Sequence, residues 1–67
     1  MNFSDAFPLM RQGYYIRRSG WKGELNKVKL GIEDDKIVDV RDNGIVLWLK
    51  NVPAEDILAC DWYAEKK

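Results

Sequence analysis

The chain has 67 residues, with 11 basic and 11 acidic side chains, no histidine and one cysteine. This length predicts one domain over residues 1–67, and the zero net charge argues against duplex nucleic acid, which favours a basic excess. One cysteine excludes an internal disulfide, and without histidine no plausible set of zinc ligands remains.

A domain this small buries only about 60% of its unfolded surface, so a single hydrophobic core is marginal. Such domains usually gain a disulfide, a metal or a partner chain. With the first two excluded, a homo-oligomer is predicted. The sequence lacks the apolar core of a signal peptide and the ~20 apolar residues of a membrane span, so we expect a soluble cytoplasmic protein without a membrane partner.

Residues 2–12 are predicted to form a helix. Four apolar side chains recur at the spacing of one helix face, namely Phe3, Ala6, Phe7 and Met10. Ser4 is the expected N-cap, with Asp5 in the first turn, where the helix dipole favours an anion. Gly13 is expected to end the helix in the left-handed conformation.

Three strands are predicted next, over residues 14–18, 25–32 and 37–41. The turn "SGWKG" separates the first two, and "EDDK" joins the second to the third. Apolar and polar residues alternate in the second strand, so Val28 and Leu30 share one face. In the third strand, Val38 and Val40 are expected to face inward.

The dipeptide Asn43-Gly44 is a strong hairpin signal, and the strand predicted after it, residues 45–50, is apolar on both faces. Such a strand needs cover on both sides, from a helix or from a second subunit. Pro53 is expected to open a short helix, and a short strand follows it. The expected fold is α+β: an N-terminal helix packed on an antiparallel sheet of four or five strands, with a short helix near the C-terminus.

The side chains offer little for catalysis. Cys60 has no histidine to act as its base, and it is predicted to be a buried structural thiol. Two acidic groups, residues 33–35 and the pair Glu55-Asp56, fall at a hairpin tip and in a first helical turn, so solvated or capping roles are expected for them. The sequence has no glycine-rich phosphate loop. We therefore expect no enzyme, no cofactor and no metal.

Residues 14–23, "YYIRRSGWKG", form the best binding candidate, because every charge from residue 6 to residue 23 is basic. Arginine pairs bidentately with phosphate oxygens, and aromatic rings offer faces on which a base can stack. A nucleotide site is therefore one interpretation. In the other, Trp21 fills the small core, and the arginines are solvated or pair with acids such as Asp56 or Asp61. The residues alone leave both open.

Two segments carry a family resemblance. The opening "MNFSDAFPLMRQGYYIRRSGWKG" has a helix, a short basic strand and an Arg-x-Gly-Trp turn, and the closing "RDNGIVLWLKNVPAEDILACDW" has a Trp strand and an Asp-apolar-Leu-Ala-x-Asp-Trp ending. In this order they resemble the Thoeris anti-defence 2 family of small phage proteins. The matching positions are Phe3, Ala6, Gly13, Ile16, Arg18, Gly20, Trp21 and Gly23 in the opening, and Asp42, Gly44, Trp48, Asp56, Leu58, Ala59, Asp61 and Trp62 in the closing.

The resemblance implies a sponge that acts without turnover in the cytoplasm of the bacterial host. Such proteins bind immune signalling nucleotides, notably glycocyclic ADP-ribose isomers and in some relatives cyclic di- or trinucleotides, and so keep the host effector inactive. They are homo-oligomers with ligand pockets between subunits, which implies a dimer or tetramer here. This chain has a shorter middle segment than typical members, and Cys60 and Tyr63 stand where acidic residues are common.

The ligand contacts are predicted on the basic segment and the Trp strand. The candidate ligand-binding residues are Tyr15, Arg17, Arg18, Trp21, Lys22 and Trp48. The two arginines would pair with phosphate oxygens, Lys22 would add positive field, and Trp21 with a second ring would stack on the base. An alternative is a small oligomeric protein-interaction module that inhibits a host protein directly, since arginine and aromatic residues are also typical of interface hot spots. Single-stranded nucleic acid is a weaker third possibility at zero net charge.

Overall fold

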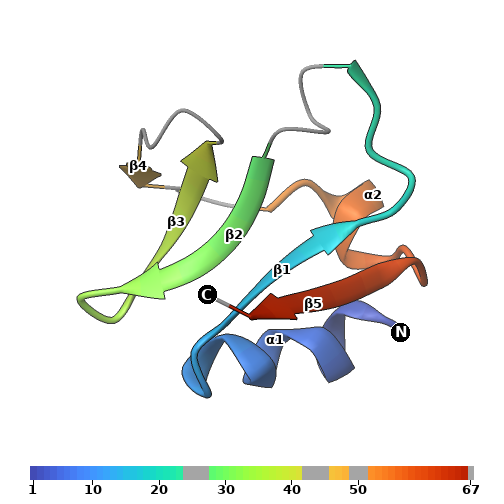
Figure 1. Ribbon diagram of the computed structural model, residues 1–67. Coiled ribbons are helices and arrows are strands. Elements are labelled where there is room, and N and C mark those ends of the chain that lie inside the picture. Colours follow the sequence, from blue (N-terminus) through green and yellow to red (C-terminus); the bar gives the residue numbers. More distant parts are fainter. Residues whose placement is uncertain (24–27, 42–45, 49–51, 67) are drawn as a thin grey trace.

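The computed structural model of the protein describes residues 1–23, 28–41, 46–48 and 52–66, and for 46–48 the backbone alone. In chain order its elements are α1 (Phe3–Arg11), β1 (Tyr14–Arg18), β2 (Val28–Glu33), β3 (Lys36–Arg41), β4 (Val46–Trp48), α2 (Ala54–Ile57) and β5 (Trp62–Lys66) (Figure 1). The described strands form one antiparallel sheet in the order β4-β3-β2-β1-β5. The predicted α+β fold is confirmed, with five strands in the described sheet.

The N-cap of helix α1 lies two residues earlier than predicted. Asn2, not Ser4, is the N-cap: its side-chain oxygen accepts the Asp5 backbone N–H at 3.0 Å. Ser4 lies inside the first turn and donates its hydroxyl to the same Asn2 oxygen at 2.9 Å. The prediction of a Ser4 cap was wrong because both residues carry a capping oxygen, and only Asn2 has the extended backbone that a cap needs. Gly13 follows the helix with a φ of +96°, as predicted.

The hydrophobic core lies between α1 and one face of the sheet. Ala6 and Met10 on α1 are almost fully buried, and Phe3 and Phe7 pack beside them, which confirms the predicted apolar helix face. The strands contribute Ile16, Val28, Leu30 and Trp62. In Figure 1, α1 runs below β1 and β5, while neither α1 nor α2 lies in front of the sheet.

The β2–β3 hairpin places valine on the face away from α1. Asp34 and Asp35 have φ values of +53° and +61°, typical of a two-residue hairpin turn. The register that follows pairs Gly31 with Val38. Since Leu30 faces α1, Gly31 and Val38 face the other way. Val38 is buried as predicted, with 1% of its surface exposed, yet on the opposite side of the sheet.

Some element ends differ from the prediction or lie outside the described residues. Strand β2 begins at Val28 in the described chain, and residues 25–27 lie outside it. The same holds for residues 45, 49 and 50 of the predicted fourth strand. Pro53 precedes α2 as its N-cap, one position earlier than expected. Within the described chain, neither helix has the length and apolar character needed to cross a membrane.

Candidate functional site

Strand β1 sends its two neighbouring arginines to opposite faces of the sheet. Arg18 pairs across β5 with Trp62, on the α1 side, whereas Arg17 pairs with Tyr63 and faces away from α1. Each arginine stands in its own cluster of side chains. We call the first the clasp, made of Arg18, Gly20, Trp21, Asp56 and Asp61, and the second the open-face cluster, made of Tyr15, Arg17, Lys29, Tyr63 and Glu65.

Arg18 is the centre of the clasp. Its Nε donates to Asp61 Oδ1 at 2.7 Å, and its Nη1 donates to Asp56 Oδ1 at 2.6 Å. Both distances are at the short end for charge-assisted bonds. The hydrogen bonds to Asp61 and then Asp56 raise the pKa of Arg18 above its usual value. In return, the hydrogen bond from Arg18 lowers the pKa of the Asp61 carboxyl.

Asp56 ties the clasp to the aromatic core. Its Oδ1 also accepts the Trp21 Nε1–H at 3.1 Å, and its backbone carbonyl accepts the Trp62 Nε1–H at 2.7 Å. The two indole rings pack edge to face, with centroids 5.4 Å apart. Trp21 is only 8% exposed. The expected solvated or capping role of Asp56 was wrong, because its side chain turns inward from the first turn of α2 to meet the arginine and the indole.

Gly20 lets the loop after β1 close around Asp61. Its backbone N–H donates to Asp61 Oδ2 at 2.8 Å, and the Ser19 N–H donates to the Asp61 carbonyl at 3.0 Å. A Cβ at position 20 would lie 2.5 Å from that carboxylate oxygen. Only glycine permits this approach without a shift. The clasp therefore joins the two sequence segments that carry the family resemblance.

The open-face cluster has longer contacts than the clasp, although its arginine is slightly less exposed, with 13% of the Arg17 side chain accessible against 19% for Arg18. Arg17 Nη1 lies 3.3 Å from Glu65 Oε1, and Lys29 Nζ lies 3.9 Å from Glu65 Oε2. The Lys29 ammonium stands 4.7 Å from the centroid of the Tyr15 ring. That ring lies against β2 where Gly31 has no side chain, since a Cβ there would approach it to 2.9 Å.

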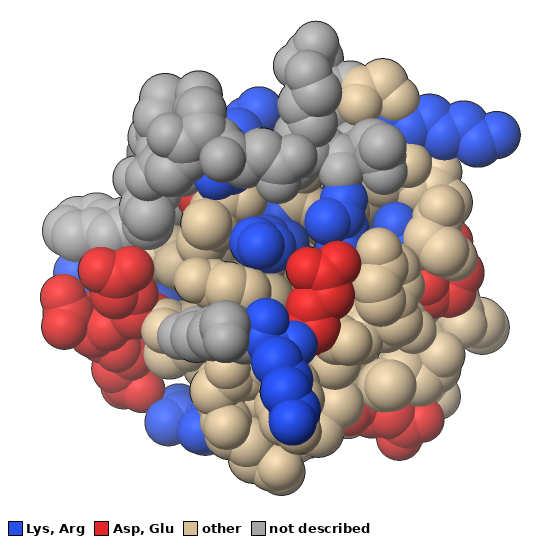
Figure 2. Space-filling view, viewed as in Figure 1, with Lys and Arg blue, Asp and Glu red and all other residues tan. Residues whose placement is uncertain are grey.

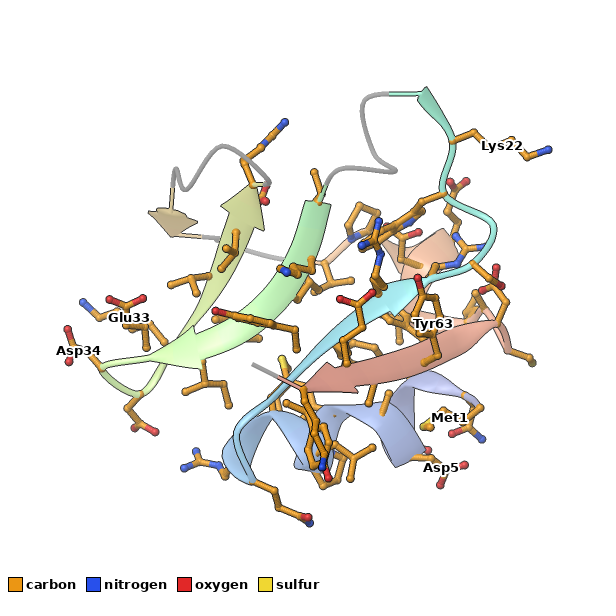
Figure 3. The ribbon with its side chains drawn as sticks, viewed as in Figure 1. Met1, Asp5, Lys22, Glu33, Asp34 and Tyr63 are labelled. Atoms are coloured by element: carbon orange, nitrogen blue, oxygen red, sulfur yellow. The ribbon has the colours of Figure 1, made fainter. Side chains whose placement is uncertain are left out.

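The space-filling view looks onto this face of the sheet. Basic side chains gather near its middle beside an acidic one, and a separate acidic group lies at the β2–β3 hairpin (Figure 2). Figure 3 shows Tyr63 in front of β5, where it is 39% exposed. Tyrosine rings and two cations thus share one face, and side chains of these kinds can bind planar rings and phosphate oxygens.

The structure divides the six predicted site residues among different places. Tyr15 and Arg17 lie together in the open-face cluster, whereas Arg18 and Trp21 lie in the clasp on the other side of the sheet. Lys22 is exposed and points away from the rest of the molecule (Figure 3). The side chain of Trp48 lies outside the described residues. Ligand binding by these six residues stays a prediction.

Lys29 and Glu65 have no sequence signal that marks them as members of the open-face cluster. Lys29 looks like any polar residue of an alternating strand, and Glu65 lies in a terminal strand. Glu65 meets Arg17 and Lys29 only because β2 and β5 flank β1 in the sheet. The prediction that Cys60 is a buried thiol was wrong, because Cys60 is exposed. The prediction relied on the apolar neighbour Ala59. Both residues lie in the connection between α2 and β5, where one apolar neighbour does not indicate burial.

One comparison with known proteins gives a match. A family model described as the Thoeris anti-defense 2-like domain matches residues 1–64 of the chain. Neither the curated proteins nor the solved structures contain a match. The matched range includes every residue of the clasp and all of the open-face cluster except Glu65.

Proposed function

This chain belongs to the Thoeris anti-defense 2-like family, whose role is directed against the Thoeris defence, and on that premise we propose that it is a nucleotide sponge. It binds an immune signalling nucleotide, either a glycocyclic ADP-ribose isomer or a cyclic oligonucleotide, and holds it without degrading it. The host effector then stays inactive. The observation that supports this most is the open-face cluster, where two cations and two tyrosines share one face of the sheet.

The cations of the cluster suit phosphate oxygens. Arg17 supplies a planar fork that can engage two oxygens at once, and Lys29 adds a point charge next to it. Their side chains are 13% and 25% exposed, so each is partly desolvated. A phosphate held there gains more from each contact than it would at a fully exposed charge.

The tyrosines suit the planar part of the ligand. Tyr15 lies along β2 over Gly31, and Tyr63 stands on the neighbouring edge strand. A base stacked on an aromatic ring gains about 1–3 kcal/mol. A nanomolar complex requires about 12 kcal/mol, so a sponge also needs walls that enclose its ligand. A second subunit over this face would supply such walls.

An exposed apolar pair on α2 supports a homo-oligomer, a dimer or tetramer with pockets between its subunits. Leu58 is 79% exposed and Ile57 is 44% exposed. Leu58 is also one of the positions at which the closing segment resembles the family, yet its surface is not used within the described chain. Apolar surface of this kind is typical of subunit contacts. Light scattering should report an oligomer, and Leu58→Asp should shift it towards monomer while Glu55→Ala does not.

The remaining predicted contacts belong to the same proposal. Lys22 extends the positive field near the loop after β1, and Trp48 would supply a second ring for the base. Arg18 and Trp21 reach the ligand only if binding opens part of the clasp, because their polar groups are already bonded to Asp56 and Asp61. We therefore assign the first contacts to Arg17 and Tyr15.

Ligand depletion tests the sponge directly. The protein is incubated with a panel of cyclic ADP-ribose isomers and cyclic oligonucleotides, filtered, and then heated to release what it holds. Loss of one nucleotide from the filtrate, with intact recovery after heating, is the expected result. Degraded nucleotide would indicate an enzyme, and an unchanged filtrate across the panel would contradict the proposal.

A second candidate, a module that inhibits a host protein directly, is supported by the same exposed Leu58. It predicts that Leu58→Asp leaves the oligomeric state unchanged and abolishes capture of one specific host protein. It also predicts no rise in the unfolding temperature when nucleotides are added. The two candidates therefore differ in both measurements.

A further inference from the structure

Glu65 occupies the place in the open-face cluster where a ligand oxyanion would bind. Its two carboxylate oxygens face two different cations, one directed at Arg17 and the other at Lys29. A phosphate or pyrophosphate group presents the same arrangement, with two oxygens that need two positive partners. Ligand and Glu65 therefore compete for the same pair of side chains.

The contacts of Glu65 are long for charge-assisted bonds. They measure 3.3 Å and 3.9 Å, whereas such bonds are typically about 2.7–2.9 Å long. Glu65 is 33% exposed, so water screens both pairs and each is weak. The same protein makes bonds of 2.6 Å and 2.7 Å to Arg18 on the other face, so the long distances belong to this cluster in particular.

Glu65 lies on a strand with one neighbour in the described sheet. β5 is an edge strand that pairs on one side with β1, where Glu65 is the partner of Tyr15. The carboxylate is held by side chains alone among the described residues, with no backbone N–H bonded to it. A rotation of its side chain would break both of these ion pairs.

We propose that Glu65 is a built-in competitor of the ligand, which keeps Arg17 and Lys29 in place when the site is empty and swings away when a phosphate-bearing ligand binds. This inference rests on the proposed nucleotide site. It makes Glu65 a specificity-determining residue: anionic ligands must displace it, whereas a neutral ring that stacks on Tyr15 need not. Weakly bound anions of the host cell are thereby kept out.

The test compares wild-type protein with Glu65→Gln, which keeps the shape of the side chain and removes its charge. Glu33→Gln is the matched control, because it makes the same charge change at the exposed hairpin tip. Each protein is titrated with inorganic pyrophosphate and, separately, with adenosine, and binding is followed by NMR shifts. Pyrophosphate should bind Glu65→Gln about fivefold tighter, the equivalent of one exposed ion pair. The Glu33→Gln protein should stay within about twofold of wild type for pyrophosphate, and adenosine should bind all three proteins alike.

Equal or weaker pyrophosphate binding by Glu65→Gln would overturn the inference, as would an equal gain in Glu33→Gln. A gain for adenosine as large as that for pyrophosphate would overturn it too. Glu65→Thr, a second variant suited to a strand, must behave as Glu65→Gln does, and thermal unfolding checks that both are folded. A protein that depletes a nucleotide but fails this test keeps its proposed function and loses the competitor. A protein that passes this test but depletes no nucleotide keeps the competitor role of Glu65 and loses the proposed function.

Discussion

Arg17 and Arg18 are neighbours in β1, yet their side chains lie on opposite faces of the sheet and have different acidic partners. Arg18 lies on the α1 side and donates at 2.6 Å and 2.7 Å to two aspartates. Asp56, one of the two, is also bonded to a buried indole. Arg17 faces the side that neither helix covers, and its Glu65 partner lies 3.3 Å away on an edge strand. Two identical side chains thus differ in how many other groups hold their partners in place.

On the proposed function, this difference would let a domain without a disulfide separate stability from binding. The clasp links the loop after β1, helix α2 and the start of β5, which are far apart in sequence, and so it replaces the missing covalent staple. The open-face cluster carries charges with longer contacts, and it is where we propose that the ligand binds. Strand alternation alone keeps the two apart. Changes in one cluster should leave the other nearly intact.

The largest effect is expected from Asp56→Ala. The change removes the partner of both Arg18 and Trp21 and leaves a buried indole N–H without an acceptor, which should destabilise the protein by about 3 kcal/mol. For a domain of this size that lowers the unfolding temperature by about 15 °C. Thermal unfolding followed by circular dichroism measures it. Glu55→Ala, its exposed neighbour on α2, is the control, and similar losses in the two variants would refute the clasp.

Gly20→Ala should have the next largest effect. The added methyl group would lie 2.5 Å from Asp61 Oδ2, so either the loop or the carboxylate must shift. We expect a loss of about 1–3 kcal/mol, typical of forced overpacking. Urea unfolding measures the difference. Ser19→Ala, which removes only a 3.3 Å contact to the Asp61 carbonyl, should lose far less, and equal losses would contradict the close approach.

Acid should weaken the clasp through Asp61. The hydrogen bond from Arg18 lowers the folded pKa of Asp61, while the unfolded carboxyl has a pKa of about 3.9. Because the folded value is the lower one, this stabilisation is complete above the unfolded pKa and is lost as the pH falls through it towards the folded pKa. Urea unfolding at several pH values should show wild type losing stability below about pH 4. Asp61→Asn should be less stable at neutral pH and flatter over the same range, and parallel curves would count against the assignment.

Local patterns in the sequence predict the elements well and the clusters poorly. The apolar face of α1, the strand at residues 14–18 and the "EDDK" turn each follow from spacing within a few residues. The clusters depend on β5 pairing with β1, which brings together residues 43 positions apart in the clasp and 48 apart on the open face. Spacing carries no information on such pairings. Asp56 and Asp61 could therefore be named only as possible partners of an arginine.

The smallest effect on stability, and the largest on binding, is expected from Arg17→Ala. Its ion pair with Glu65 is long and partly exposed, so the loss of this pair should cost only about 0.5 kcal/mol. Removing the planar fork from the ligand site should weaken nucleotide binding by about tenfold or more, since a charge-assisted bond contributes roughly 1.5–3 kcal/mol. Arg11→Ala is the matched control: its exposed side chain pairs with Asp35 at the hairpin, and neither stability nor depletion should change much. If Arg17→Ala unfolds as readily as Asp56→Ala, the two faces are not separate. If it depletes nucleotide as well as wild type does, the ligand does not bind at Arg17. Arg18 and Trp21 in the clasp would then be the next candidates for ligand contacts.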